Sequence, residues 1–330
     1  MQVELRFAPG SAIHHDLSAV RQDGRCLWVA GDEWAGVERL TWRDGAFQDH
    51  HTFRLADFVD LPAGPDEEAD IEGLARADGW LWAVGSHSLK RKRVKPGQHG
   101  DKARKRLATV VREENRFVLV RLPLVDRDGL PTPVRKDGRR QAAILSGPGR
   151  NLSDMLEHDP HLAPFLRLPG KDNGFDIEGI AVIGERVFVG LRGPVLRGWA
   201  VILEIHPEPD PHADDRLRFA PVGDARYRTH FVDLDGLGIR DLCPIGDEIL
   251  ILAGPTMTHD GPVKIVRWTP GNDFSDQPVH VADLHTGVRD DRPEGLTLLS
   301  NGQLMIVHDS PSPQRLTPEG VWADVLTLSG

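Results

Sequence analysis

The chain lacks the features that mark membrane-spanning, secreted and redox proteins. It contains no apolar run of 18 or more residues, so we expect neither a membrane span nor a membrane partner. Residues 1–6 lack the basic stretch followed by an apolar stretch that forms a secretory signal. Cysteine occurs only at Cys26 and Cys243, each in an expected strand, and we interpret both as buried free thiols. These absences predict a cytoplasmic protein.

Familiar catalytic motifs and long amphipathic helices are missing too. The chain has no His-Glu-x-x-His zinc motif, no Gly-x-x-x-x-Gly-Lys phosphate loop and no Gly-x-Ser-x-Gly nucleophile elbow. Its net charge of −10 makes general nucleic-acid binding unexpected. Helical periodicity is weak, and the best candidate is a short helix from Asn151 to about His158, with Asn151 or Ser153 as its cap.

A repeated phrase is the most informative feature that the chain does contain. Asp-Ile-Glu-Gly-Leu-Ala at 70–75 returns as Asp-Ile-Glu-Gly-Ile-Ala at 176–181, and in degraded form at 292–297. Each copy precedes a short polar turn and an apolar strand, and two further segments, at 17–20 and 239–242, keep this layout with other residues. Self-similarity in a fixed order indicates a repeat architecture.

The spacing of the repeats predicts an all-β fold, a single β-propeller over residues 1–330. The equivalent positions Leu17, Ile71, Ile177, Ile239 and Pro293 are 54, 106, 62 and 54 residues apart, which suits four-stranded blades. We expect five blades, or six if residues 107–175 hide another, and a two-sheet sandwich is the rival fold. Two insertions are expected, a basic loop at 89–107 and an irregular segment at 125–175 with the short helix. Val3–Phe7 or Val321–Leu328 should complete the blade begun at the other terminus.

In a propeller, the first strand of each blade starts at the same face where the second strand ends. We therefore expect many polar side chains around one mouth of the central channel. Glu72, Glu178 and Glu294 share one orientation there, and Arg240 takes the same place in its own repeat. One interpretation is that these groups pair between blades and lock the ring. The other is that the three glutamates bind Ca²⁺ or Mg²⁺, which prefer hard oxygen ligands.

The second interpretation implies further roles for neighbouring polar residues. The candidate catalytic groups, which would supply acid–base and anion-stabilising chemistry, are His87, His308, Asp309 and Arg192. The candidate ligand-binding groups are Ser86, Lys90, Arg91 and Arg240. Residues 90–106 carry nine Lys or Arg and one Asp, and would be either a solvated loop or a flap over an anionic ligand such as a phosphate ester.

Four segments resemble an uncharacterised bacterial family, domain of unknown function thirty-six-sixteen. They are residues 68–74, 85–92, 174–180 and 190–200, the last reading Gly-Leu-Arg-Gly-Pro-Val-Leu-Arg-Gly-Trp-Ala. More distantly, the Glu-Gly-Leu/Ile-Ala openings look like those of esterase-like phytase and lactonase-type propellers. In the lactonase type an inward Glu binds a divalent cation, and this resemblance assigns that role to Glu72, Glu178 and Glu294.

Two classes of function stay open from the sequence. The first is a metal-assisted hydrolase that acts on a small anionic molecule, a phosphate ester or a lactone. The second is a non-catalytic binding or scaffold propeller that recognises a protein partner. Retention of a divalent cation together with ester hydrolysis separates the two.

Overall fold

The computed structural model describes residues 1–257, 260–271, 274, 277–286 and 290–328. Most strands belong to antiparallel sets of four that follow one another along the chain. The first set is β2 (Leu17–Asp23), β3 (Cys26–Gly31), β4 (Gly36–Arg43) and β5 (Ala46–Arg54). The second is β6 (Ile71–Ala77), β7 (Trp80–Gly85), β10 (Leu119–Arg127) and β14 (Ala143–Leu145). The third is β15 (Asp176–Ile183), β16 (Arg186–Gly193), β17 (Trp199–Asp210) and β19 (Arg228–Asp233).

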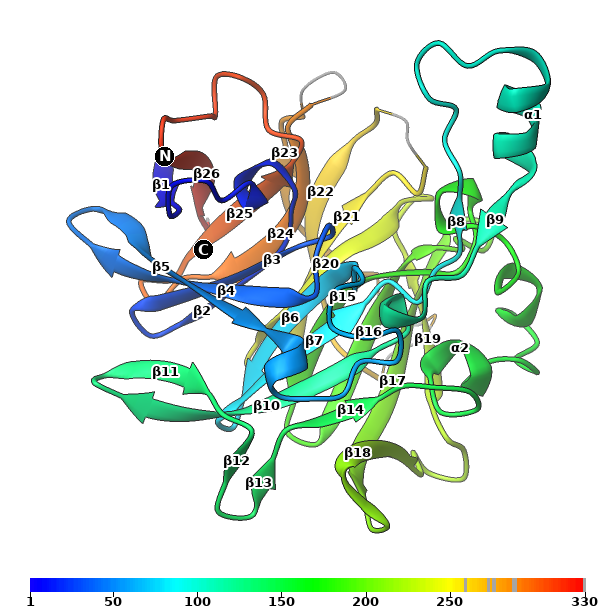
Figure 1. The fold of residues 1–330 in the computed structure, drawn as a ribbon, viewed down its shortest axis with the longest axis horizontal. Helices are drawn as coiled ribbons and strands as arrows, with labels where there is room; N and C mark the ends of the chain where they lie inside the picture. The colour runs from blue at the N-terminus through cyan, green and yellow to red at the C-terminus, as the bar shows by residue number, and fades with distance from the viewer. Residues whose placement is uncertain (258–259, 272–273, 275–276, 287–289, 329–330) are drawn as a thin grey trace.

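The last two sets bring the ends of the chain together. The fourth set is β20 (Gly238–Ile245), β21 (Glu248–Gly254), β22 (Val263–Trp268) and β23 (Val279–Leu284). The fifth is β24 (Arg292–Leu298), β25 (Gln303–Asp309), β26 (Gly320–Thr327) and β1 (Gln2–Arg6). The innermost strands β2, β6, β15, β20 and β24 pack in this order, and β24 packs against β2. The fold is therefore a β-propeller, as the repeats predicted (Figure 1).

The N-terminal strand closes the ring. β1 pairs antiparallel with β26, from Gln2 opposite Asp324 to Arg6 opposite Gly320. Leu5 at its centre is fully buried. Gly320 is required at this seam, because a Cβ atom there would lie 1.8 Å from the carbonyl oxygen of Leu5. Of the two terminal segments, the N-terminal one thus supplies the outermost strand.

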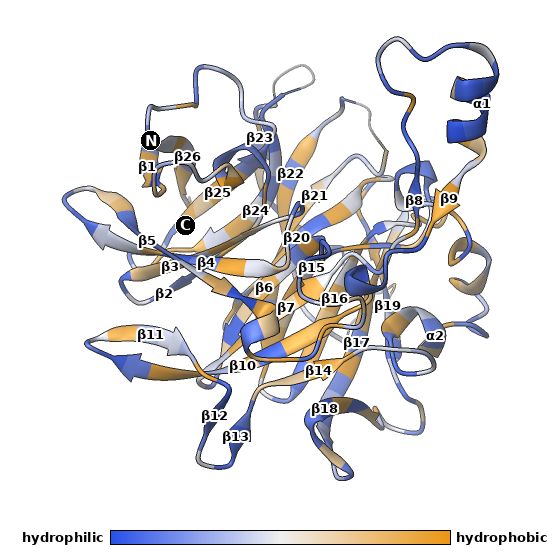
Figure 2. Cartoon of the chain, in the orientation of Figure 1, coloured by the Kyte–Doolittle hydropathy of each residue, from blue (hydrophilic) through white to orange (hydrophobic). Residues whose placement is uncertain are grey.

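The apolar core lies between neighbouring four-stranded sets. Trp28 and Leu74 belong to a cluster between the first and second sets, and Phe188 and Leu242 to one between the third and fourth. Figure 2 shows the apolar residues concentrated along the strands, whereas the connecting hairpins and α1 are hydrophilic. Because each sheet is covered on both faces, apolar residues occur at consecutive as well as alternating positions of its inner strands.

The remaining elements lie in the connections. The short strands are β8 (Lys90–Arg91), β9 (Val110–Val111), β11 (Leu130–Pro133), β12 (Lys136–Asp137), β13 (Arg140–Gln141) and β18 (Ala213–Ala220). The 3₁₀ turns are Ile13–His15, Leu55–Asp57, Glu114–Arg116, Ala163–Phe165 and Gly170–Asp172. No helix among the described residues is long and apolar enough to cross a membrane.

One helix was expected from the sequence and the other was not. α2 (Leu152–Met155) starts after Asn151, whose side chain accepts a hydrogen bond of 2.9 Å from the Asp154 amide. α1 (Gly100–Ala108) starts inside the segment predicted as a basic loop, residues 89–107, and ends one residue beyond it. The described part of the chain therefore has two helices where one short helical insertion was expected. Lys, Arg and Ala are strong helix formers, and the cations of its last turn suit the helix dipole.

Candidate functional site

Side chains enter the mouth of the channel because each innermost strand is bulged near its start. In β6, Ile71 pairs with Gly85 and Gly73 pairs with Val84, so Glu72 is left out of the ladder. The other four innermost strands show a register shift near the same place. A bulge redirects a side chain out of the sheet. This explains why Glu72 and its equivalents in the other repeats reach the mouth.

The glycine of the repeated phrase serves close packing of the inner strands. A Cβ atom on Gly179 would lie 2.9 Å from the Cα atom of Asp241 in the next innermost strand. On Gly73 it would lie 3.1 Å from the carbonyl carbon of Gly179. The phrase thus combines a polar group for the mouth with a residue that lets neighbouring strands approach.

Two arginines neutralise the carboxylates on one side of the mouth. Arg240 Nη1 lies 3.1 Å from Glu178 Oε2 and 2.6 Å from Glu294 Oε1. Arg192 pairs with both Asp176 and Glu178. Burial raises the pKa of Glu178 to about 8, and the two guanidinium groups oppose this shift. Glu178, Glu294 and Arg240 therefore make the contacts expected of a lock between blades.

The expected Ca²⁺ or Mg²⁺ site has no ready-made ligand set here. No group of three or more His, Cys, Asp or Glu side chains in the described part of the chain is arranged to hold a metal ion. Arg240 lies against two of the three glutamates proposed as ligands. A cation shared by Glu72, Glu178 and Glu294 would require this guanidinium to move away.

Arg116 organises the second repeat in the same way. Its guanidinium pairs with Asp70, donates to Ser86 Oγ at 3.1 Å and to Ser88 Oγ at 3.2 Å, and reaches Glu113 at 3.3 Å. The Ser86 hydroxyl, predicted to bind ligand, is therefore engaged with Arg116 and fully buried. Sequence reasoning missed Arg116 because it precedes the third strand of its set, outside the repeated phrase.

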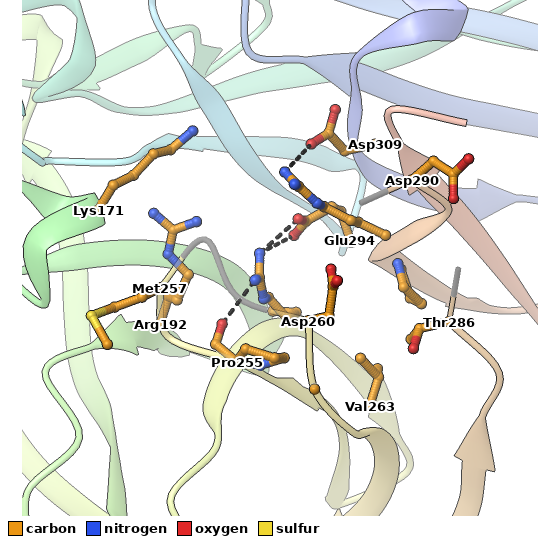
Figure 3. A pocket seen from close by; sticks show the side chains of 14 residues that line it. Lys171, Arg192, Pro255, Met257, Asp260, Val263, Thr286, Asp290, Glu294 and Asp309 are labelled. Carbon is orange, nitrogen blue, oxygen red and sulfur yellow. Dashed lines mark hydrogen bonds and ion pairs between the residues drawn. The ribbon is translucent and has the colours of Figure 1, made fainter. Parts of the chain in front are cut away.

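A solvent-open pocket lies beside the two arginines (Figure 3). Its charged lining residues are Lys171, Arg192, Arg240, Arg292, Asp260, Asp290, Glu294 and Asp309. Met257, Val263 and Pro255 add apolar surface. The cations differ in how strongly they are engaged. Arg292 lies 3.9 Å from Asp309, and no ion pair of Lys171 is found in the described part of the structure.

Two carboxyl groups beside this pocket have raised pKa values. Burial, with help from Asp70 and Asp309, raises the pKa of Asp32 to about 7, whereas Lys171 acts in the opposite direction. Burial and the neighbouring charges of Asp70 and Glu178 raise the pKa of Glu72 well above its usual range. Asp32 does not line the pocket, but its charge interacts with those of Lys171 and Asp309, which do. Its Oδ1 atom is buried without a hydrogen-bond partner among the described residues.

The two histidines predicted as catalytic lie beneath the mouth. His87 is buried, its Nδ1 lies 2.9 Å from the Gly85 carbonyl oxygen, and its ring packs against Phe117. His308 is also buried, and its Nε2 lies 3.6 Å from Asp324 Oδ2. Burial lowers the pKa of each to about 4. Neither lines the pocket, whereas Arg192, Arg240 and Asp309 do.

Lys90 and Arg91, predicted to bind ligand, lie outside the pocket in β8. The Lys90 ammonium is 3.4 Å from Glu68 and 3.5 Å from Glu113. Arg91 Nε lies 2.5 Å from Asp172 Oδ2, next in sequence to Lys171. No residue of 90–106 lines the pocket. The basic segment thus touches the turn that carries Lys171 but does not cover the pocket.

Several solved propellers are similar in fold to this chain. A glutaminyl cyclase from Myxococcus xanthus is 10% identical, with coverage of 100% of this chain and 98% of that one and a TM-score of 0.44. A PQQ-bound aldose sugar dehydrogenase from Streptomyces coelicolor is 12% identical, with 98% and 96% covered and a TM-score of 0.41. The Cps50 (Swd1) β-propeller domain of Myceliophteria thermophila is 9% identical, with 95% and 96% covered and a TM-score of 0.36.

These similarities concern the fold alone, and they assign no chemistry to the mouth. No match was found among curated protein sequences. Residues 16–324 match the model of the family described as "Protein of unknown function (DUF3616)". This match runs from just before the first innermost strand into β26 and so covers most of the chain, and the chain therefore belongs to that family.

Proposed function

We propose that the mouth pocket binds a small organic anion, such as a phosphate ester or a carboxylate. One observation carries the proposal: the pocket is lined by the Lys171 ammonium, which has no ion pair in the described structure, and by Arg292, whose guanidinium lies 3.9 Å from Asp309. Arg192 and Arg240 are already neutralised by carboxylates. An anion that enters would therefore find two cationic groups with unused capacity, and charge-assisted hydrogen bonds to such groups are strong.

The rest of the lining selects for a ligand that is not a bare ion. Met257 and Val263 offer apolar contacts on the wall of the pocket, and Asp290 and the Thr286 hydroxyl offer polar ones. An anionic group at one end and hydroxyl groups along an apolar skeleton match this arrangement. Sugar phosphates and hydroxy acids have this character.

Isothermal titration calorimetry with glucose 6-phosphate and with inorganic phosphate tests this function. We expect Lys171→Gln to weaken binding of glucose 6-phosphate about tenfold or more, since it removes one charge-assisted contact. Lys136→Gln is the matched control, because Lys136 is an exposed lysine on β12, away from the pocket. Binding that is absent, or equally affected by both substitutions, would overturn the proposal.

A second candidate, hydrolysis of a bound ester or lactone, is favoured by the raised pKa values of Asp32 and Glu72. In this scheme Asp32 as carboxylate takes a proton from the attacking water, and Glu72 as acid gives one to the leaving oxygen. The products are a carboxylic acid and an alcohol. Asp32 then releases its proton to solvent and Glu72 takes one up, so both groups return to their starting states, and ionisation of the product acid accounts for the net proton release. Groups whose pKa lies near neutrality are suited to both tasks.

The rate of lactone hydrolysis, followed by proton release, tests this second candidate. Asp32→Asn and Glu72→Gln should each lower kcat by about a hundredfold or more while ligand binding persists. Calcium titration in the same samples tests the expected cation at Glu72, Glu178 and Glu294, which Glu178→Gln should weaken. Ligand binding without turnover would leave the mouth as a binding site and exclude this chemistry.

A further inference from the structure

The segment from Leu89 to Val111, here named the basic arm, projects from the ring (Figure 1). Its base is a two-stranded stem in which Lys90 pairs with Val111 and Arg91 with Val110. α1 follows the stem outward, and none of its residues is buried. Because no residue of α1 is buried, the helix gains no stability from an apolar core. Packing against the ring therefore does not account for this helix.

The arm is anchored at its base and unneutralised beyond it. Lys90 and Arg91 pair with Glu68, Glu113 and Asp172 of the ring. The seven further cations are Lys92, Arg93, Lys95, Lys102, Arg104, Lys105 and Arg106. None has an ion pair in the described part of the structure, and Asp101 is the one acidic residue among residues 90–106. Such a concentration of like charge is costly unless an anionic partner offsets it.

Apolar side chains accompany these charges. Leu107 is 51% exposed, Val110 39% and Val94 37%. Ala103 and Leu107 are four residues apart in α1, beside Lys102 and Arg106 with the same spacing, so an apolar stripe adjoins a cationic one. Exposed apolar side chains within a charged surface lower solubility, and they are typical of surfaces that contact another protein.

The composition of the arm disfavours nucleic acid. Residues 89–111 contain no Phe, Tyr or Trp, so the arm has none of the aromatic rings on which bases of single strands stack. The whole chain carries a net charge of −10, which repels the long phosphate backbone of a duplex. A short acidic peptide can contact the arm without meeting the acidic ring.

We propose that the basic arm docks an acidic protein segment in which Leu-like side chains are interspersed with Asp and Glu. The carboxylates meet Lys102, Arg104 and Lys105, and the apolar side chains meet Leu107 and Val110. The partner is held away from the mouth, because no arm residue lines the pocket.

Fluorescence anisotropy with a labelled Glu/Leu peptide, at several salt concentrations, tests the docking. The triple substitution Lys102→Gln, Arg104→Gln and Lys105→Gln should weaken binding about tenfold or more, and rising salt should weaken binding to the unaltered protein. The matched control replaces three exposed cations of the β10–β13 hairpins, namely Arg127, Lys136 and Arg139, by Gln. It should change the affinity less than about twofold.

A second peptide, with Ser in place of each Leu, isolates the apolar contribution. It should bind more weakly than the Glu/Leu peptide, and Leu107→Ser should remove most of this difference. A duplex DNA of similar charge is the competing probe. Tighter binding of DNA than of the peptide, equal binding of both peptides, or equal losses from the two triple variants would each overturn the proposal. Urea unfolding followed by tryptophan fluorescence reports that the variants are folded.

Discussion

Arg21 and Asp241 form an ion pair between innermost strands that are not neighbours in the ring. Arg21 Nη2 of β2 lies 3.1 Å from Asp241 Oδ1 of β20, and both side chains are buried. The same guanidinium donates to the carbonyl oxygens of Leu74 at 2.7 Å, Leu296 at 2.5 Å and Leu242 at 2.9 Å. Arg21 therefore joins four innermost strands and closes the channel below the mouth.

Removing this guanidinium should be strongly destabilising. Arg21→Met leaves the Asp241 carboxylate buried without its partner, and breaking a buried pair in this way costs about 3–5 kcal/mol. Urea unfolding followed by tryptophan fluorescence measures the loss. Asp241→Asn added to Arg21→Met should restore part of the stability, since it removes the buried charge and its amide oxygen still accepts from one of the two backbone amides, of Leu242 and Leu296, that the two carboxylate oxygens bind. A double variant as unstable as Arg21→Met alone would argue against charge burial as the cause.

Because the inner strands approach closely at Gly179, replacing this glycine should lower the stability of the fold strongly. Gly179→Ala places a Cβ atom 2.9 Å from the backbone of Asp241 at a residue with φ +142°. Backbone cannot give way as a side chain does, so the free energy of unfolding should fall by about 3 kcal/mol or more. Gly184→Ala is the control, with φ +59° and open space around it, and should cost about 1 kcal/mol. Equal losses would show that strand contact is unimportant.

The two buried histidines should make the protein sensitive to acid. The pKa of His87 and of His308 is lowered to about 4 in the folded chain, whereas an unfolded histidine titrates near 6.5. Between these values the unfolded chain binds more protons, so stability falls as pH is lowered from 6.5 towards 4. Each histidine contributes up to about 3 kcal/mol to this loss.

Urea midpoints at neutral pH and at the lower end of this window measure the effect. His87→Asn keeps a residue that tolerates the left-handed backbone at this position, where φ is +51°. Combined with His308→Gln, it should make the decline in stability with acid distinctly shallower. An unchanged pH dependence would assign the acid sensitivity to other groups.

The pairing of β1 with β26 should contribute to the stability of the closed ring. Leu5→Ala removes a fully buried side chain from β1 and should cost about 2–5 kcal/mol. Gln2→Ala in the same strand is the control, because Gln2 is exposed. Thermal unfolding compares the two. A loss at Leu5 no larger than at Gln2 would mean that β1 contributes little to the closed ring.

The repeated phrase predicted the innermost strands because the same physical demand recurs in each repeat. In three of the innermost strands a polar group at the mouth is followed by a glycine that lets the next inner strand approach, so Glu72-Gly73, Glu178-Gly179 and Glu294-Gly295 are visible in the sequence. The pairing of Arg240 with Glu178 and Glu294 is one of the two interpretations that the sequence allows. The choice between ion pairing and metal binding depends on distances between side-chain atoms, which the spacing of residues along the sequence does not give.

Other site residues were not predictable from position along a strand. His87 follows the end of β7, but its backbone is left-handed, and its ring packs against Phe117. His308 and Asp309 are adjacent in β25, so they face opposite ways, and only Asp309 lines the pocket. Lys171 lies in a connection whose sequence has no counterpart in the other repeats, so no pattern indicated it.

Arg21 also limits how alike the repeats can become. Arg21 lies four residues after Leu17, and the residues four positions after Ile71, Ile177, Ile239 and Pro293 are all small, namely Ala75, Ala181, Cys243 and Thr297. Only one long side chain fits at the centre, so a second arginine there would meet the first. Perfect internal symmetry is thus sterically excluded at this level. A chimera built from copies of the β2–β5 repeat would fail at its axis, even if every sheet formed correctly.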